Sequence, residues 1–574
     1  MLSSRLAWLA TLVSTSVVAT GIATESGCAQ KATGAATGTE QDLTNQIDDV
    51  HRTLNDLASF GEKRVGTPEG AKAAAYVMTR MQQAKLENVH FEAFNFPQHV
   101  ANLRGSSFHV TSNGQPAAAI DFDVFEGSGS GRADNAPIVF VGSAKPADLA
   151  GKDLKGKIAF VKRDSKFHRS SQYLNVTAAG AVAMLYMSTV PDNQIQIGSI
   201  RHAWEAMGKI PTITIGQADG DRLNTMLGQG ELRATIEVKA TVTHGTGRNV
   251  IGMVPGRNFG QRDASGKSLD HQIVIGAHYD TWYTGSVDNG CGVAAMLGLA
   301  QRLGQTAAFE HTIVFVGFDG EEVALYGGYD YLRKHQDDGI LAVINFEMPA
   351  AEPDVMAGGL ETLLRGVASS QISVVDDALE ESRTAGLFNT FLASVSLDRV
   401  ENMFGGIIPT DIQGIYRSGI PTVTTASDSP FYHTRKDTPD KVDAEFLAEG
   451  VRSFEGAVHH FLAAPLEKFK ERDATLWGAD VEVISRGPDD PQALVKVALT
   501  DPGGKKLSQT DVTGTLFCDD FFAAPDIVVK TDAAGTAVLA FKDQLVGCRG
   551  KRYVHIAAGK DYPLVEKVRA IPSR

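Results

Sequence analysis

The sequence is poor in cysteine, has no run of basic residues and contains a single long apolar stretch. Its 54 lysines and arginines are outnumbered by 68 aspartates and glutamates, which leaves a net charge of −14. An acidic chain without a basic run offers no surface for nucleic acid or for an anionic membrane. The remaining composition, with 43% hydrophobic and 21% charged residues, is that of an ordinary soluble globular protein.

The four cysteines form no thiolate set of the kind that holds a structural metal. Cys518 and Cys548 lie close together near the C-terminus, and in an exported chain they are the expected disulfide pair. Cys291 stands near the candidate site described below, but Asp288 beside it is the better metal ligand. We therefore expect Cys291 to be a small buried thiol.

The single long apolar stretch follows Arg5 and ends near residue 23, which predicts a signal peptide over residues 1–23. Thr, Ser and Gly dilute the stretch, and this disfavours a retained transmembrane anchor. Ser26-Gly27-Cys28 offers an alternative lipoprotein cleavage site, although Glu25 stands where such sites have an aliphatic residue. We expect an exported protein, periplasmic or secreted, with a lipid anchor at Cys28 as the alternative.

A chain of 574 residues is too long for one core, and its sequence pattern changes along its length. Short β runs separated by Gly, Asn and Asp give way to alternating strands and helices, and then to strands divided by Gly-containing turns. The expected fold is α/β, with a mixed sheet flanked by helices. The expected segments are a flexible leader (24–40), an N-terminal part of the main domain (41–101), a β-rich insertion (102–245), the main domain (246–466) and a C-terminal β-sandwich (467–574).

Imidazole and carboxylate groups follow the predicted strands of the main domain. Three apolar runs, at 272–277, 312–318 and 341–346, are each followed directly by such groups, and another group follows a later strand-like run. The carboxyl ends of strands are where open α/β sheets place their sites. The sequence therefore predicts one site that contains His278, Asp288, Glu321, Glu322, Glu347 and His433.

One type of ion suits these groups. Imidazole and carboxylates without thiolates favour zinc, and Asp288 has two oxygens with which it can bridge two ions. The adjacent Glu321 and Glu322 diverge at a strand end, so that one can bind metal while the other faces the attacking water. His433 completes a set with one histidine and one carboxylate for each ion, in addition to the bridge.

Together these motifs resemble peptidase family M28, the zinc peptidases that include bacterial leucyl aminopeptidases and glutamate carboxypeptidases. Residues 64–67 resemble a family motif that precedes the main domain. The insertion resembles a protease-associated (PA) domain, and we expect its residues to offer no chemistry of their own. The main matching stretches are residues 249–256, 276–280, 286–292, 318–322 and 432–434.

The resemblance implies an exported dinuclear zinc exopeptidase with two Zn²⁺ ions per subunit. In that family pattern, His278 and Glu347 would hold one ion, Glu322 and His433 would hold the other, and Asp288 would bridge them. Glu347 stands where the family usually has Asp and reaches one methylene further. The geometry of the ion at Glu347 is therefore expected to differ from the usual one.

The resemblance also implies three roles that involve no metal bond. Glu321 would be the general base that takes a proton from a metal-bound water, Asp280 would orient His278, and Tyr432 would donate its hydroxyl to the oxyanion. Thr410-Asp411-Ile412 resembles a family segment but lacks its histidine. We therefore assign Asp411 no catalytic role.

Several functions remain as alternatives. Aminopeptidase action on peptides or small proteins is favoured, because an acidic site suits a free ammonium group. A carboxypeptidase of the same family would need an arginine for the terminal carboxylate, and Arg417 and Arg435 are the candidates. Two complete ligand sets disfavour both a glutaminyl-cyclase-like acyltransferase, which would use one zinc ion, and an inactive binding module.

Overall fold

The computed structural model describes residues 40–571 with short gaps at 118, 202–205, 306–308, 351–365, 385–392, 428, 486–492, 519–524 and 542–549. The described residues belong to one compact unit, Gly38–Arg574. The predicted signal peptide, the leader up to residue 39, Cys28 and Cys548 lie outside the described residues. Among the described helices, none combines the length and apolarity that a membrane span requires.

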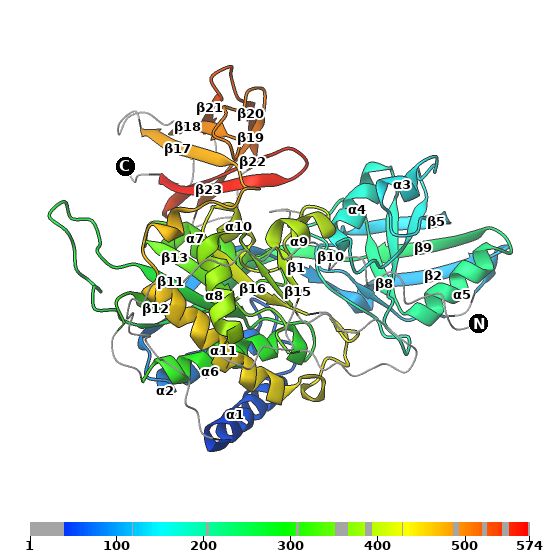
Figure 1. Cartoon of the computed structure of the whole chain (residues 1–574). Helices are drawn as coiled ribbons and strands as arrows, with labels where there is room; N and C mark the ends of the chain where they lie inside the picture. The colour runs from blue at the N-terminus through cyan, green and yellow to red at the C-terminus, as the bar shows by residue number, and fades with distance from the viewer. Residues whose placement is uncertain are drawn as a thin grey trace, which may run out of the picture. The chain divides into compact units, whose positions relative to one another are not determined.

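The central sheet of the main domain has the strand order β1-β10-β12-β11-β13-β16-β14-β15 (Figure 1). Four of its neighbouring strands, β12, β11, β13 and β16, run parallel, so their carboxyl ends lie at one edge. The near-continuous apolar runs of these strands are explained by burial on both faces of the sheet. The strands are β1 (Glu87–Ala101), β10 (Ala240–Val254), β11 (Gln272–His278), β12 (Thr312–Phe318), β13 (Ile340–Asn345), β14 (Gly366–Ser369), β15 (Ala393–Ser396) and β16 (Thr422–Ala426).

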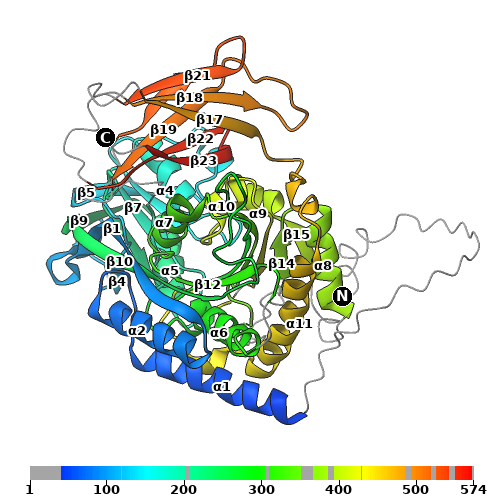
Figure 2. The same ribbon diagram turned by 90° about the vertical axis from the view of Figure 1, so that its left-hand side faces the viewer.

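Helices cover both faces of this sheet (Figure 2). Helices of one face share an apolar core with the sheet, and they are α1 (Glu40–Ser59), α2 (Pro68–Gln83), α6 (Cys291–Leu303), α8 (Ser373–Thr384) and α11 (Ala444–Ala463). A second core on the opposite face includes residues of α7 (Tyr326–His335), α9 (Leu397–Met403) and α10 (Gln413–Arg417). Thr67 followed by Pro68 is a sequence typical of a helix start, and Thr67 does cap α2, because its Oγ1 accepts the N–H of Gly70 at 3.1 Å.

The insertion forms its own sheet, in the order β3-β2-β9-β5-β6-β7-β8-β4. The long strands β1 and β10 pair antiparallel and carry the chain into and out of it. Its helices are α3 (Pro146–Leu149), α4 (Arg169–Ala178) and α5 (Gln217–Leu227). Its strands are β2 (Ser107–Ser112), β3 (Gln115–Pro116), β4 (Phe122–Val124), β5 (Gly131–Phe140), β6 (Ile158–Lys162), β7 (Ala183–Met187), β8 (Thr212–Ile215) and β9 (Leu232–Val238).

The C-terminal segment is a β-sandwich of two antiparallel sheets, β17-β18-β21 and β20-β19-β22-β23, around one apolar core. Strand-like runs in the sequence predict five of its strands, at 481–484, 493–499, 528–530, 537–541 and 553–557, but not β19 or β23. Charged residues within β23 conceal its strand pattern, and one of them, Glu566, is buried. Cys518, at the end of β19, is disulfide-bonded. The strands are β17 (Gly478–Ser485), β18 (Ala493–Thr500), β19 (Asp511–Cys518), β20 (Ile527–Lys530), β21 (Thr536–Phe541), β22 (Arg552–Gly559) and β23 (Pro563–Ile571).

Candidate metal centre

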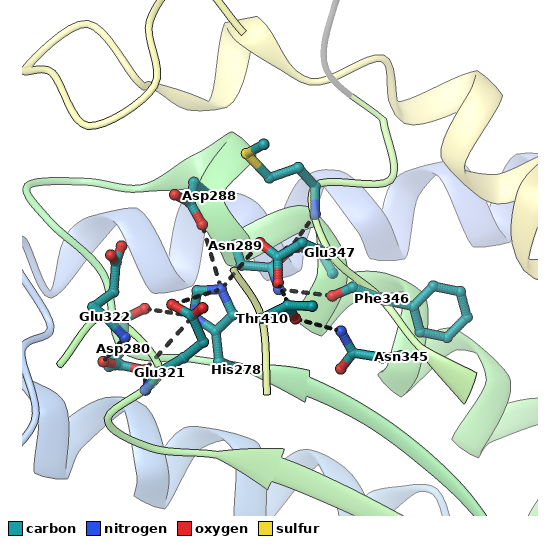
Figure 3. A network of polar contacts seen from close by, with 12 residues as sticks. His278, Asp280, Asp288, Asn289, Glu321, Glu322, Asn345, Phe346, Glu347 and Thr410 are labelled. Carbon is teal, nitrogen blue, oxygen red and sulfur yellow. Dashed lines mark hydrogen bonds and ion pairs between the residues drawn. The ribbon is translucent and has the colours of Figure 1, made fainter. Parts of the chain in front are cut away.

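The carboxyl ends of the four parallel strands bring the predicted groups together. His278 is the last residue of β11, Glu321 and Glu322 lie in the turn after β12, Glu347 follows β13, and His433 follows β16. Figure 3 shows the side chains of His278, Glu321 and Glu347 facing a common space, with Asp288 approaching from the segment before α6. The parallel arrangement of the strands thus explains why groups far apart in the sequence meet at one place.

Three of these residues form what we call the first group: His278, Glu321 and Glu347. Each offers a ligand atom, and these atoms lie within 4.8 Å of one another. His278 Nε2 lies 3.4 Å from Glu347 Oε1 and 3.9 Å from Glu321 Oε2. His278 is fully buried, whereas the side chains of Glu321 and Glu347 keep a slight exposure of 10% and 12%.

The other three residues, Asp288, Glu322 and His433, form the second group, and all three are buried. His433 Nε2 lies 2.9 Å from Asp288 Oδ2 and 3.0 Å from Glu322 Oε2. The other oxygen of Asp288, Oδ1, lies 3.3 Å from His278 Nε2 in the first group. Asp288 thus presents one carboxylate oxygen to each histidine, which is the position that a bridging ligand occupies.

The residues of both groups fit divalent cations. They bring four carboxylates and two imidazoles into a largely buried space, and such an excess of negative charge is costly without a cation. His433 Nε2 makes no hydrogen bond among the described residues although two carboxylate oxygens lie within 3.0 Å of it, and the buried Glu322 Oε1 has no hydrogen-bond partner there either. Imidazole nitrogen and carboxylate oxygen are also the ligands that zinc takes in hydrolases.

The two histidines have opposite electrostatic environments. Burial opposes a charge on His278, but Glu347 and Glu321 outweigh it and raise the pKa of His278 well above its usual value. Burial lowers the pKa of His433, which keeps this imidazole neutral near pH 7. Burial also raises the pKa values of Glu321 and Glu322, and neighbouring carboxylates add to both shifts. Burial thus dominates at His433, Glu321 and Glu322, whereas at His278 the neighbouring carboxylates outweigh it.

Asp280 contacts both His278 and the turn that carries the two glutamates. The spare ring nitrogen of His278, Nδ1, lies 3.0 Å from the backbone carbonyl oxygen of Asp280 and 3.6 Å from its carboxylate. That carboxylate also accepts the backbone N–H groups of Glu321 and Glu322, at 3.1 and 3.2 Å. A carboxylate held by two adjacent N–H groups fixes the turn that carries both glutamates.

Two further residues support the site and carry no clear signal in the sequence. The buried carboxylate of Asp437 accepts the backbone N–H groups of Val287 and Asp288, at 2.6 and 3.1 Å. Thr410 donates its hydroxyl to Glu347 Oε2 at 2.8 Å, as Figure 3 shows. Thr410 belongs to the segment 410–412, which lacks the family's histidine, and a threonine hydroxyl alone gives no sequence signal for this contact.

Cys291 begins α6 immediately after the segment that carries Asp288. Its thiol is free and fully buried, and Sγ lies 3.1 Å from the carbonyl oxygen of Val287. Burial raises the pKa of this thiol. These observations agree with the expectation of a small buried thiol, since neither thiolate character nor exposure is present.

The insertion contacts the loop that carries Tyr432 and His433, which its sequence did not indicate. The N–H of Ile197 donates to the carbonyl oxygen of His433 at 3.1 Å, and His433 Nδ1 lies 2.9 Å from the carbonyl oxygen of Ile197. Arg169, the first residue of α4, donates from a terminal guanidinium nitrogen to the Tyr432 hydroxyl at 3.3 Å. Sequence patterns could not reveal these contacts, because they join segments more than 200 residues apart.

The two arginines considered for carboxylate binding lie in unlike surroundings. Arg417 is buried, pairs with Glu566 at 2.6 Å and also pairs with Glu401. Its guanidinium is therefore already occupied. Arg435 is exposed, and its guanidinium lies 4.6 Å from the centre of the Tyr283 ring.

Comparison with known proteins gives matches to two family models. Residues 249–453 match the model of peptidase family M28, and residues 128–223 match the PA domain model. The first range contains all six residues of the two groups. The second range contains Arg169 and Ile197, which contact the loop of His433.

Two named relatives and one solved structure are similar over most of the chain. "Probable glutamate carboxypeptidase VP8" of Zea mays is 23% identical over 66% of this chain and 61% of its own length. "Probable lipoprotein aminopeptidase LpqL" of Mycobacterium tuberculosis is 24% identical, over 69% of this chain and 80% of its own. A zinc aminopeptidase from Bacillus subtilis is 21% identical with a TM-score of 0.53, and the match covers 74% of this chain and 97% of that one. This likeness shows a shared fold, and the chain spans about three fifths of the maize relative.

Proposed function

Since the chain carries a peptidase family M28 domain and a PA domain, we propose that it is an exported zinc exopeptidase that takes two metal ions. The observation that carries the proposal is the position of Asp288, with one oxygen beside each of two histidines. His278 and Glu347 would hold one ion, and Glu322 and His433 the other. When bound, zinc acts as a Lewis acid and lowers the pKa of water to near neutrality.

Glu321 is the candidate general base. Its Oε2 lies 3.9 Å from His278 Nε2, further than the nearest oxygen of Glu347 at 3.4 Å, and we assign Glu321 to the attacking water and Glu347 to the metal. Burial raises the pKa of Glu321, and a carboxylate with a raised pKa can both accept a proton and return it. The carboxylate of Asp280 holds the turn and so aims this side chain.

Tyr432 is the candidate donor to the oxyanion that forms when water attacks the peptide carbonyl. Burial raises the pKa of Tyr432, so its hydroxyl keeps its proton. The hydroxyl oxygen accepts a hydrogen bond from Arg169, which leaves the O–H itself available to donate. In other hydrolases, removal of one hydrogen-bond donor to the oxyanion raises the activation free energy by about 3 kcal/mol.

Aminopeptidase action is the favoured form of this exopeptidase activity. The excess of carboxylates around the site suits the free ammonium group of a peptide's N-terminus. A relative named an aminopeptidase and the fold shared with a zinc aminopeptidase support the same choice. The name of the lipoprotein relative also supports export, together with the predicted signal peptide.

Carboxypeptidase action is the second candidate, and one observation favours it. Arg169 lies beside Tyr432, where its planar guanidinium could bind the carboxylate of a short substrate. The maize relative is named a glutamate carboxypeptidase. Arg169 therefore takes the place of Arg417 as the arginine on which this alternative depends.

Paired substrates test both candidates. Dipeptides and aminoacyl amides would be offered with a free N-terminus and with an acetylated one, before and after treatment with a chelator, and again after zinc is restored. An aminopeptidase cleaves only the free-amine set, loses activity with the chelator and regains it with zinc. Cleavage of the acetylated dipeptides alone would favour the carboxypeptidase. A purified chain that binds no zinc would contradict the proposed mechanism.

A further inference from the structure

We propose that the PA domain supports the second group, because residues 196 and 197 of that domain hold His433 in its metal-binding orientation. This inference rests on the proposed zinc site and names positioning residues for it. The contacts come from the insertion, whereas every residue of the two groups lies in the main domain. The PA domain would thus support one metal position directly.

The first step concerns the ring of His433. Its Nδ1 lies 2.9 Å from the carbonyl oxygen of Ile197, which can only accept a hydrogen bond. The proton of a neutral imidazole must then sit on Nδ1, so that Nε2 presents its lone pair to the space beside Asp288 and Glu322. Ile197 therefore selects the tautomer that a metal ligand requires.

The second step concerns the backbone of the same loop. His433 has φ +59°, in the left-handed region that residues other than glycine seldom adopt. Two consecutive carbonyl oxygens are held by the PA domain: Ile197 donates its N–H to that of His433 at 3.1 Å, and Gln196 donates its amide to that of Tyr432 at 2.8 Å. These bonds stabilise an otherwise unfavourable backbone conformation.

The third step concerns Gln196, which is 4% exposed. Its backbone carbonyl accepts a hydrogen bond from the hydroxyl of Thr214 in β8, at 2.9 Å. The segment that holds His433 is therefore fastened to the sheet of the PA domain. Movement of that domain would be transmitted to the His433 loop.

The first group is supported differently. His278 is held by the carbonyl of Asp280, and Glu347 by the hydroxyl of Thr410, and both supports belong to the main domain. A change in the 196–197 segment should consequently weaken one of the two metal positions and leave the other intact.

Gln196→Met tests this inference, because it keeps the size of the side chain and removes its donor. Zinc affinity would be measured by competition with a chromophoric chelator, on full-length protein whose fold is checked by circular dichroism and thermal unfolding. We expect one of the two zinc equivalents to bind about 10-fold more weakly or worse, since loss of an outer contact to a metal ligand commonly has that effect. Ile197→Pro, which removes the N–H bonded to His433, is the second variant.

Asp192→Ala is the matched control. Asp192 lies in the same loop and pairs with Lys436 of the His433 loop, but both side chains are substantially exposed. Its loss should leave both zinc affinities unchanged. If Asp192→Ala weakened zinc as much as Gln196→Met does, general loosening of the contact would explain the result and the inference would be wrong.

Combined variants identify which metal position is affected. In a Glu322→Ala background, which already lacks the second position, Gln196→Met should change zinc content little. In a Glu347→Ala background it should weaken the one remaining equivalent. Unchanged affinities in both Gln196→Met and Ile197→Pro would overturn the inference while leaving the proposed function in place. Wild-type protein that fails to bind two zinc equivalents would instead overturn the proposed metal centre.

Discussion

Asp288 belongs to the second group and also lies beside His278 of the first, but the two groups are built from different parts of the molecule. The first group stands on adjacent parallel strands, and its supports Asp280 and Thr410 come from the same domain. The second group includes His433, whose loop follows β16 and is bonded to Ile197 of the PA domain. One half of the site is thus a property of the sheet, whereas the other half depends on a domain inserted far away in the sequence.

The electrostatic contrast follows from the same arrangement. His278 is surrounded by Glu321 and Glu347, which raise its pKa, and burial lowers that of His433. In the absence of a cation, a proton on His278 would offset part of the carboxylate charge. Nε2 of His433 would stay unprotonated and keep its lone pair for a metal ion.

Glu321→Gln should give the largest loss of activity among these variants. It also tests whether Glu321 acts on the water or binds the metal of the first group. We expect kcat to fall about 10²- to 10⁴-fold, because the proton acceptor is lost. Zinc content should stay at two equivalents, since Glu321 is assigned to the water and not to the metal. The measurements are steady-state kinetics and metal analysis of the same preparation. Loss of one zinc equivalent would show that Glu321 is a ligand of the first group.

Arg417→Met tests what a buried charge cluster contributes where no metal site is proposed. The change leaves Glu401 and Glu566 without their guanidinium partner, and we expect the free energy of unfolding to fall by about 3–5 kcal/mol. Zinc affinity should stay the same. Lys530→Met, which breaks an exposed pair with Asp511, is the control and should cost less than about 1 kcal/mol. Chemical denaturation measures both variants, and an equal loss of unfolding free energy in the two would refute the difference between the buried and the exposed pair.

The same cluster predicts a pH dependence of stability. Although burial opposes it, His555 and Arg417 lower the pKa of Glu566 to about 2, below the value of about 4.3 for an unperturbed glutamate. The folded protein therefore favours the charged form. Its contribution, on the order of 3 kcal/mol, is complete above about pH 4.3 and is lost as the pH falls towards 2.

Denaturation of wild-type protein and Glu566→Gln at several pH values measures this contribution. The difference in unfolding free energy should shrink as the pH falls below about 4.3. A difference that is constant from pH 6 to pH 3 would mean that the charge of Glu566 contributes nothing.

Thr410→Val should give the smallest effect and complements the test at Gln196. The hydroxyl bonded to Glu347 Oε2 is lost, and we expect about 10-fold weaker binding of the zinc ion in the first group. In a Glu347→Ala background the same change should have no further effect on zinc. Thr243→Val, at an exposed position of β10, is the control. Equal zinc loss in the control would remove Thr410 from its positioning role.

Much of the fold and of the candidate site could be predicted from local patterns. The apolar run 312–318 coincides with β12, and Thr67 with Pro68 predicts the start of α2, because burial and capping act over a few residues. Of the six residues of the two groups, all except Asp288 follow predicted strands, and parallel strands place their carboxyl ends at one edge. The sequence does not predict β23, because a charged residue is expected at the surface. Glu566 of β23 is instead buried, where it pairs with Arg417 from a distant segment.

The sequence by itself determined which groups could meet, since the type of each residue and its position after an apolar run are visible in short stretches of sequence. Only the tertiary structure decided how those groups are supported. The carboxylate of Asp280 holds the turn of the two glutamates, Thr410 rather than Asp411 contacts Glu347, and Ile197 of the PA domain contacts His433. A hydrogen bond between segments distant in sequence requires no particular residue type when a backbone group supplies it. Such a contact therefore leaves no pattern in the sequence and becomes visible only when the chain is folded.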